Sequence, residues 1–506
     1  MRVLFASAEA YPLAKTGGLA DVSAALPMAL GAMGVDARLV LPGYPDAIAA
    51  AANKSIRYAA DDFAGFGPIK IVSARTPDTG LPVWLVDCPG LFHRFGGLYQ
   101  DETGKDWADN ALRFALFSRA AAAIATGELV PEWHADVVHA NDWHAGLLPA
   151  YLAAAGAKRV GTVFTIHNLA FQGVFPASFW PRLGLPDAFF STNGLEYYGK
   201  LSFLKAGIRY SDQLTTVSPT YAREILTEEF GCGLYGILRA RRDCLTGILN
   251  GVDSRAWDPA TDPHLPANFS KGNIAGKRAC KIALQQELNL QPASDVPLMI
   301  YISRITDQKM ADVVLDALPA ILGHGAQFAL LGEGEAAFQR QFEQAARASP
   351  GRVSVRIGYD EPLAHRLHAG ADILLHPSRF EPCGLTQLYA MRYGTVPIIR
   401  RIGGLADTVV DTDDQSLRDG TATGFAFDEP SSENFISCIE RSLNLFRQPV
   451  RWRRIQRRAM AQDFGWESSA RKYLKLYQRV APNAAPEPET HDAEEMKRDF
   501  ARKVTG

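Results

Sequence analysis

KTGGLADV, residues 15–22, and IGGLADTV, residues 402–409, share the phrase Gly-Gly-Leu-Ala-Asp. Paired glycines let the backbone turn tightly and bring a ligand close to main-chain N–H groups. Helix N-termini attract anions through unpaired N–H donors and the positive end of the helix dipole. A cation precedes each copy: Lys15 before the first, and Arg400 and Arg401 before the second. The two copies therefore predict two facing domains that grip an anionic ligand between them.

Short apolar runs alternate with longer helical patterns on both sides of a break at about residues 248–272, which contains Pro259, Pro263 and Pro266. Apolar runs without alternation are typical of strands buried on both faces. The predicted strands are residues 3–6, 37–41, 83–86, 137–140, 163–166 and 214–217 before the break, and 298–302, 328–331, 353–357, 373–375 and 396–399 after it. Predicted helices in the first half include residues 19–33, 108–125 and 145–154.

This pattern predicts an α/β fold laid out twice, as two doubly wound domains over residues 1–250 and 251–450. Residues 451–480 are expected to form closing helices that cross back to the first domain, and residues 481–506 a flexible tail. In doubly wound sheets, ligands bind in the crevice at the carboxyl ends of the strands. A ligand is therefore expected between the two domains.

Composition limits the class of partner. The chain has 506 residues, with 53 Lys and Arg against 55 Asp and Glu, which argues against a nucleic acid partner. Six cysteines without CxxC spacing indicate a reducing compartment rather than a disulfide framework. The N-terminus reads as a strand rather than a signal peptide, and no run approaches the ~18 apolar residues of a membrane span. We expect a cytoplasmic protein without a membrane partner.

Two loops at predicted strand ends carry charged groups. SRITDQK, residues 303–309, places Arg304 and Lys309 near a helix start, either as surface cations or as partners of an anion that offsets the helix dipole. SRFEPCGLT, residues 378–386, offers fresh N–H donors after Pro382. Glu381 is either an N-terminal helix charge or a carboxylate aimed at a ligand, and the spacing leaves both open.

Three further clusters suggest metal or catalytic chemistry at first sight. His167 ends a predicted strand, although a lone histidine is more often structural. In HANDWH, residues 139–144, the His–His spacing of five does not fit the zinc helix spacing, so Asp142 and Trp143 are expected as a helix cap and a packing residue. Asp411-Thr412-Asp413 matches the Asp-x-Asp pattern of metal-dependent sugar transferases, but it is expected in a solvated loop. No metal site is predicted.

Together these phrases resemble the family of bacterial glycogen synthases and plant starch synthases, which are retaining glucosyltransferases. The resemblance runs from residue 1 to about 480 and rests on KTGGLADV (15–22), HANDWHAG (139–146), TIHNLAFQG (165–173), LNGVD (249–253), SRITDQK (303–309), SRFEPCGLTQLYA (378–390) and RRIGGLADTV (400–409). It implies a GT-B fold, in which two Rossmann-like domains face each other across a metal-free active site. The C-terminal helices of such enzymes cross back onto the first domain.

The resemblance also assigns roles to residues. It implies that Lys15 contacts the diphosphate of the nucleotide sugar, that Arg304 and Lys309 neutralise the leaving diphosphate, and that Glu381 and His167 lie at the donor glucose. Tyr359 is expected to pack on adenine. The resemblance also implies main-chain donors near Cys383 and Gly384 for the glucose hydroxyls, and Thr386 near phosphate. The further predicted substrate-binding residues are Gly17, Gly18, Asp21, Asp142, Asn250 and Leu385.

The implied reaction moves glucose from ADP-glucose to the nonreducing 4-hydroxyl of an α-1,4-glucan, with retention of the α configuration and without a cofactor. The alternatives are a related enzyme that uses UDP-glucose or another acceptor, a Rossmann oxidoreductase, disfavoured by the lack of Gly-x-Gly-x-x-Gly, and a silent glucan-binding protein. Retention is expected through acceptor attack on the leaving-group face, with a covalent intermediate on Glu381 as the weaker alternative. The chain departs from the family pattern at Met310, where Gly is usual, and at Ile402, where a small polar residue is usual.

Overall fold

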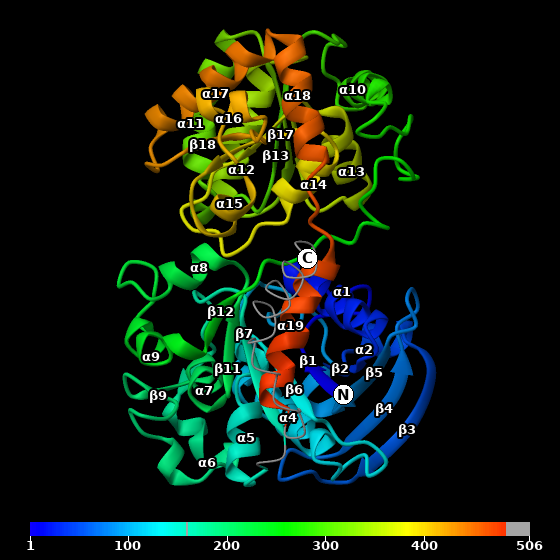
Figure 1. Cartoon of the computed structure of the whole chain (residues 1–506). Coiled ribbons are helices and arrows are strands. Elements are labelled where there is room, and N and C mark those ends of the chain that lie inside the picture. Colours follow the sequence, from blue (N-terminus) through cyan, green and yellow to red (C-terminus); the bar gives the residue numbers. More distant parts are fainter. Residues whose placement is uncertain (158–159, 482–506) are drawn as a thin grey trace, which may run out of the picture.

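The computed structural model describes residues 1–157 and 160–481, which form two α/β domains stacked end to end (Figure 1). The predicted tail from residue 482 onward lies outside the described residues. Each domain is built on a twisted sheet with helices on both faces, because its central strands are apolar on both sides. In β1 (Arg2–Ala6), for example, Val3, Leu4, Phe5 and Ala6 are all fully buried.

The first domain contains a nine-stranded sheet in the order β12-β11-β7-β6-β1-β2-β5-β4-β3. Its strands are parallel from β12 to β5, and β4 and β3 extend the edge as an antiparallel hairpin. The strands are β1, β2 (Asp36–Pro42), β3 (Ala52–Ala60), β4 (Ile69–Arg75), β5 (Pro82–Asp87), β6 (Val137–Asn141), β7 (Gly161–Ile166), β11 (Gln213–Thr216) and β12 (Leu245–Gly247). A small antiparallel sheet contains β8 (Val174–Pro176), β9 (Glu196–Tyr197) and β10 (Lys200–Ser202).

The helices of this domain are α1 (Gly18–Ala32), α2 (Pro45–Ala50), α3 (Pro89–Phe92), α4 (Asn110–Ala125), α5 (Leu148–Ala154), α6 (Trp180–Leu183), α7 (Phe203–Tyr210), α8 (Pro219–Glu224) and α9 (Tyr235–Ala240).

The second domain has a six-stranded, fully parallel sheet in the order β15-β14-β13-β16-β17-β18. Its strands are β13 (Leu298–Ile302), β14 (Gln327–Gly332), β15 (Val353–Ile357), β16 (Ile373–His376), β17 (Val396–Arg400) and β18 (Phe425–Phe427). Its helices are α10 (Ala275–Glu287), α11 (Ala311–Gly323), α12 (Ala336–Ala348), α13 (Glu361–Gly370), α14 (Thr386–Arg392), α15 (Gly403–Thr408), α16 (Asp414–Asp419), α17 (Ser432–Phe446) and α18 (Pro449–Met460).

The chain then returns to the first domain through α19 (Trp466–Val480). Of the two helices α18 and α19, the first stays with the second domain and the second crosses back: Trp452 of α18 packs into the core of the second domain, whereas Tyr473 and Tyr477 of α19 are buried in the core of the first. The Tyr477 hydroxyl lies 2.6 Å from His139 Nδ1 on β6. The chain passes between the domains twice, near Val252 and near Phe464. These two connecting segments lie side by side, because the Val252 N–H donates to the Phe464 carbonyl at 2.7 Å.

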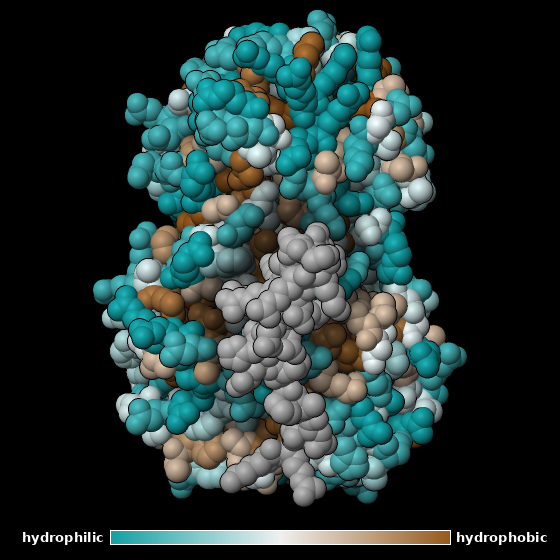
Figure 2. Space-filling model, in the orientation of Figure 1, coloured by the Kyte–Doolittle hydropathy of each residue, from teal (hydrophilic) through white to brown (hydrophobic). Residues whose placement is uncertain are grey.

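All eleven strands predicted from apolar runs are present, and no end is shifted by more than two residues. Strands β3 and β4 were not predicted, because their exposed edge lacks a continuous apolar run, and neither were the short strands β8–β10, β12 and β18. The face in Figure 2 is mainly hydrophilic, with hydrophobic side chains visible where the two domains meet. None of the helices in the described parts of the chain is long and apolar enough to cross a membrane.

Candidate active site

The KTGG loop after β1 is held in place by the buried carboxylate of Glu9. Its Oε2 accepts hydrogen bonds from the N–H groups of Thr16 (2.7 Å) and Gly17 (3.1 Å), and its Oε1 accepts from the Thr16 hydroxyl (2.6 Å). The Tyr99 hydroxyl donates to the same Oε1 at 2.7 Å. The next amides, of Gly18 and Leu19, open α1 without an acceptor among the described residues. They remain available to an anion.

Lys15 lies where the two domains meet. Its Nζ is 2.9 Å from Asp21 Oδ1 and 4.0 Å from Oε2 of Glu361, which belongs to the second domain. The ammonium also lies over the rings of Tyr11 and Tyr359, at 5.2 and 5.8 Å from their centroids. Burial lowers the pKa of Lys15, but Asp21 and the second-domain groups outweigh it and raise that pKa above its usual value. Lys15 is therefore a charged group that faces both domains.

Glu381 follows β16 and has an exposed fraction of only 6%. Its Oε2 accepts hydrogen bonds from Lys309 Nζ, from the Ser378 hydroxyl (3.1 Å) and from His376 Nε2 (3.2 Å). Burial by itself raises the pKa of a carboxyl group, but Lys309 and His376 hold the pKa of Glu381 well below its usual range. Glu381 is thus an ionised carboxylate beside a cation, rather than a simple helix-end charge.

The two cations of the SRITDQK loop differ in environment. Lys309 ends a 3₁₀ turn, Asp307–Lys309, with its side chain 14% exposed beside Glu381. Arg304 is exposed, and its guanidinium donates to Gln308 Oε1 at 3.1 Å. Met310, where Gly is usual in the family, keeps a left-handed backbone with φ of +54° and buries its side chain completely. The substitution therefore leaves the turn after Lys309 in a conformation that glycine would favour.

The segment after Glu381 exposes several N–H groups. Gly384 has φ of +73°, and α14 begins at Thr386 without a side-chain cap. Within residues 1–157 and 160–481, the amides of Gly384, Leu385 and Thr386 have no acceptor. A Cβ added to Gly18 would lie 3.5 Å from the Leu385 side chain, so this segment faces the KTGG loop of the other domain.

His167 is fixed in one tautomer by its neighbours. Asn141 Nδ2 donates to the carbonyls of Ala6 (3.1 Å) and His139 (3.3 Å), so its Oδ1 must accept from His167 Nε2 at 2.9 Å. Burial lowers the pKa of His167 to about 3, and the ring is neutral at pH 7. Its Nδ1 is therefore an acceptor that could take a hydrogen bond from a sugar hydroxyl.

Asp142 is not the helix cap that the sequence predicted. It has φ of +54° and makes no side-chain cap bond to the 3₁₀ turn that follows; its Oδ1 instead accepts from the N–H of His167 at 2.8 Å. Burial raises its pKa to about 7. Trp143 is a packing residue, as expected, with its ring 4.9 Å from that of Phe114.

The remaining predicted residue, Asn250, lies at the first crossing between the domains. It is 8% exposed, and its Oδ1 is buried without a partner among the described residues. The backbone N–H of Asn250 bonds to the thiol of Cys383, and burial raises the pKa of that thiol to about 12. Asn250 therefore touches the segment that carries Glu381.

The second Gly-Gly-Leu-Ala-Asp copy does not form an anion-binding loop, which corrects the prediction. The Gly403 N–H donates to Glu224 Oε1 at 2.9 Å, and the Gly404 N–H to the Glu381 carbonyl at 3.1 Å. Arg400 binds the carbonyls of Arg379 and Asp428, and Arg401 pairs with Asp428 and Asp411. The amides of Gly403 and Gly404 are therefore already hydrogen-bonded, and of the two copies only the first can offer its amides to a ligand.

The Asp-x-Asp segment is also more structured than predicted. Asp411 is paired with Arg441 at 2.9 Å, and the Asp413 side chain caps α16 by accepting from the Ser416 N–H at 2.7 Å. No group of three or more His, Cys, Asp or Glu side chains that could hold a metal ion occurs in the part of the chain that the structure describes.

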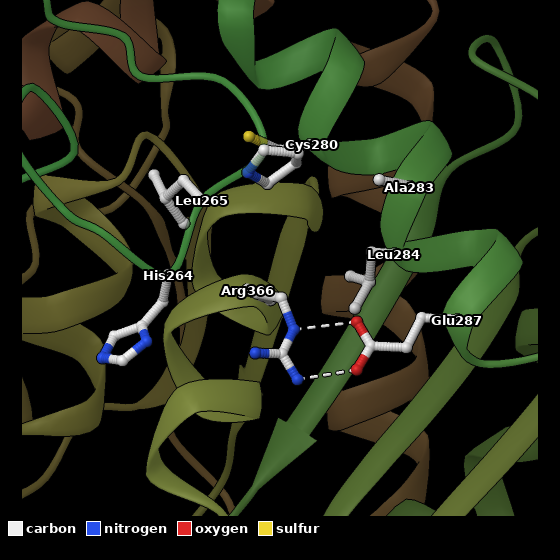
Figure 3. Close-up of a pocket in the computed structure, with 8 residues that line it drawn as sticks. His264, Leu265, Cys280, Ala283, Leu284, Glu287 and Arg366 are labelled. Atoms are coloured by element: carbon white, nitrogen blue, oxygen red, sulfur yellow. Dashed lines mark hydrogen bonds and ion pairs between the residues drawn. The ribbon is translucent and has the colours of Figure 1, made fainter.

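A cavity of about 290 Å³ on the second domain is separate from these residues (Figure 3). It lies between α10, α13 and the segment that contains His264 and Leu265, and Arg366 closes one side through a two-pronged ion pair with Glu287. None of the predicted site residues lines it.

Five residues at the site were not predicted from the sequence: Glu9, Tyr99, Glu361, His376 and Ser378. Glu9 and Tyr99 lie 90 residues apart in the chain, and no local pattern connects them. His376 and Ser378 lie on either side of Pro377 just before Glu381, and their closeness in sequence was the one available signal.

Comparisons with known proteins agree with this geometry. The family "Starch synthase catalytic domain" matches residues 2–240, and "Glycosyl transferases group 1" matches residues 286–459. The glycogen synthase of Paramagnetospirillum magneticum is 54% identical over 485 residues, covering 96% of this chain and 98% of that protein. That of Burkholderia thailandensis is 52% identical over 482 residues, covering 95% and 90%.

Solved structures give the same result. The catalytic domain of starch synthase IV from Arabidopsis thaliana, bound to ADP and acarbose, has a TM-score of 0.85 at 34% identity and covers 95% of this chain and 99% of that chain. A sucrose-phosphate synthase from Thermosynechococcus elongatus, at 17% identity and a TM-score of 0.57 over 95% and 98% of the two chains, shares the fold. The chain therefore belongs to the glycogen and starch synthase family of retaining GT-B glucosyltransferases.

Proposed function

We propose that this glucosyltransferase transfers glucose from ADP-glucose to the nonreducing 4-hydroxyl of an α-1,4-glucan, with retention of the α configuration and without a metal or cofactor. The observation that carries the proposal is the ionised Glu381 carboxylate beside Lys309, on the segment whose free amides face the KTGG loop of the other domain. A nucleotide sugar has a diphosphate for the cations and amides, and a sugar for the carboxylate.

In this reaction the bond between the anomeric carbon and the diphosphate oxygen breaks, and its electron pair leaves with ADP. Lys15, Arg304 and Lys309 would stabilise the negative charge that builds on the diphosphate. One preorganised donor aimed at developing charge contributes roughly 10²–10³ in rate, so several together can replace a metal ion. Lys309 would bind both the diphosphate oxygens and the Glu381 carboxylate. The negative charge of Glu381 would stabilise the positive charge that develops on the glucose.

The acceptor 4-hydroxyl would attack the anomeric carbon on the face that ADP leaves, and its proton would pass to the departing phosphate oxygen. His167 supports this arrangement as a neutral acceptor for a glucose hydroxyl, because its Nε2 proton is already engaged by Asn141. A cytoplasmic location is proposed as well, since all six cysteines are free thiols, which suits a reducing compartment.

Release of ADP tests the proposal directly. Purified protein is given ADP-glucose or UDP-glucose, with and without glycogen, in the presence and absence of EDTA. We expect ADP release that depends on glycogen and is unchanged by EDTA, with product lengthened by α-1,4 linkages. Faster turnover of UDP-glucose would contradict the donor assignment, and loss of activity in EDTA that added metal restores would contradict the metal-free mechanism.

A further inference from the structure

Helices α8 and α15 cap each other across the junction between the domains (Figure 1). The N–H of Gly403, which opens α15, donates to Glu224 at the end of α8 at 2.9 Å. In return, Asp407 of α15 accepts from the N–H (2.7 Å) and the hydroxyl (2.8 Å) of Thr220 in the first turn of α8. We call these two contacts, Glu224 to Gly403 and Thr220 to Asp407, the clasp.

The start of α15 depends on the clasp because of its own sequence. The residue at the N-cap position is Ile402, whose carbonyl accepts from the N–H groups of Leu405 and Ala406 but whose side chain has no oxygen to cap the helix. Small polar residues normally fill this position. Here the carboxylate of Glu224, from the other domain, accepts from the first N–H of α15, that of Gly403, so the docked first domain supplies a side-chain acceptor at the start of this helix.

Helix α15 in turn supports the backbone that carries Glu381. The Gly404 N–H donates to the Glu381 carbonyl at 3.1 Å. A Cβ on Gly403 would lie 1.8 Å from that carbonyl oxygen, and a Cβ on Gly404 would lie 2.3 Å from the Cys383 carbonyl oxygen. Because neither glycine has a Cβ, the second glycine pair allows α15 to pack directly against residues 381–383.

The first domain also holds this backbone without α15. The Ser218 hydroxyl, the N-cap of α8, donates to the Pro382 carbonyl at 2.6 Å and is fully buried. The carbonyls of Glu381 and Pro382 are thus fixed by α15 and α8 respectively, and the clasp fixes α15 against α8.

We propose that the clasp couples docking of the domains to the position of the Glu381 carboxylate. Glu224, Thr220 and Asp407 are positioning residues: they do not touch the substrate, but they set the backbone from which Glu381 reaches it. The proposal rests on the function proposed above, because it needs Glu381 to act in the transfer.

The test measures kcat, the dissociation constant of ADP and the melting temperature for Thr220→Val, Asp407→Ala and Glu224→Ala, each of which removes one side-chain partner of the clasp. Thr220→Ser keeps the hydroxyl and serves as the conservative variant. Asp413→Ala is the matched control, because it removes the cap of α16 inside the second domain, away from the clasp. All values are taken as ratios to the wild type with whichever nucleotide sugar the wild type uses.

We expect Thr220→Val and Asp407→Ala to lower kcat about 10- to 100-fold, as small misplacements of reacting groups do, with ADP affinity changed less than threefold. Thr220→Ser should retain wild-type kcat. Asp413→Ala should lower the melting temperature by as much as Asp407→Ala without lowering kcat. Because both contacts hold the same pair of helices, the loss of kcat in the double variant Thr220→Val with Glu224→Ala should be smaller than the product of the two single losses.

Folded Thr220→Val and Asp407→Ala proteins with kcat within twofold of the wild type would overturn the proposal. So would an equal loss of kcat in Asp413→Ala, because the effect would then follow from any lost helix cap. A wild type that turns over UDP-glucose instead of ADP-glucose would contradict the donor assignment. The kcat ratios would still test the role of the clasp, because they are measured with the donor that the wild type uses.

Discussion

Replacement of Lys309 by methionine separates catalysis from stability at the Glu381 site. Methionine keeps most of the volume of the lysine stem but removes the ammonium, so the Glu381 carboxylate loses the one lysine or arginine that it pairs with among the described residues. The Ser378 hydroxyl and His376 remain as its partners, at 3.1 and 3.2 Å. The side chains of the broken pair are 14% and 8% exposed, so the loss occurs in a poorly hydrated place.

The expected size follows from that burial. Removal of one partner from a buried ion pair costs roughly 3–5 kcal/mol, and we expect the lower end, about 3 kcal/mol, because two neutral donors to Glu381 survive. For a domain of this size, 1 kcal/mol shifts the melting temperature by about 2–4 °C, which gives a fall of roughly 6–12 °C. If Lys309 also stabilises the leaving diphosphate, kcat should fall by about 10²–10³ as well.

A matched control lies in the same domain. Lys281 pairs with Asp372 at 2.6 Å, with side chains 4% and 13% exposed. Asp372 also accepts from the N–H of Leu298, the first residue of β13, so this pair lies at the opposite end of that strand from the SRITDQK loop. Lys281→Met should lower the melting temperature by a similar amount but leave kcat unchanged at a temperature where both variants are folded. The assay is glycogen-dependent ADP release at saturating ADP-glucose, together with thermal unfolding. Equal kcat values for the two variants would refute the reasoning.

Three further changes test other parts of the site. Arg304→Ala should lower kcat about 10²-fold in the ADP-release assay. Its melting temperature should stay within about 1 °C of the wild type, because the exposed guanidinium has Gln308 as its one hydrogen-bond partner within residues 1–157 and 160–481; a retained kcat would exclude Arg304 from the diphosphate site. Glu9→Gln should raise the KM for ADP-glucose about tenfold, because one amide oxygen cannot accept all four hydrogen bonds of the carboxylate. Tyr99→Phe removes one of the four donors and should raise the KM less. An unchanged KM in Glu9→Gln would show that the KTGG loop keeps its conformation without Glu9. Asp142 has a folded pKa of about 7 against the usual 3.8, so its favourable contribution is present below pH 4 and is lost as pH rises through 7. At 1.36 kcal/mol per unit, the stability of Asp142→Asn relative to the wild type should improve by up to about 4 kcal/mol over this range; denaturant unfolding at pH 4, 5, 6 and 7 measures it, and a constant difference would contradict the raised pKa.

Much of the fold could be predicted from the sequence. The continuous apolar runs identified the central strands of both sheets, because a strand covered on both faces needs no polar side chain. The fold class and the enzyme class expected from the seven phrases are confirmed by the comparisons. The edge hairpin of β3 and β4 was missed for the same reason, since its outer strand faces water and carries no such run.

The candidate site was predicted less completely. Local sequence motifs placed Lys15, Lys309 and Glu381 in loops that follow strands. Such a placement can be predicted because it depends only on residues that are close together in the chain. The motifs could not show that Asp142 receives the His167 amide, or that Glu9 holds the KTGG loop together with Tyr99. Such contacts join segments that are distant in sequence, and no local pattern records them.

The repeated Gly-Gly-Leu-Ala-Asp phrase shows which features follow from the sequence and which follow from the tertiary structure. Sequence by itself determined that both copies start a helix after a strand, because glycine pairs and apolar spacing act over a few residues. Only the tertiary structure decided that the first copy keeps free amides facing the second domain, while the second gives its amides to Glu224 and the Glu381 carbonyl. A backbone N–H is the same donor in both copies, and what it binds depends on which acceptor the packed domains bring to it.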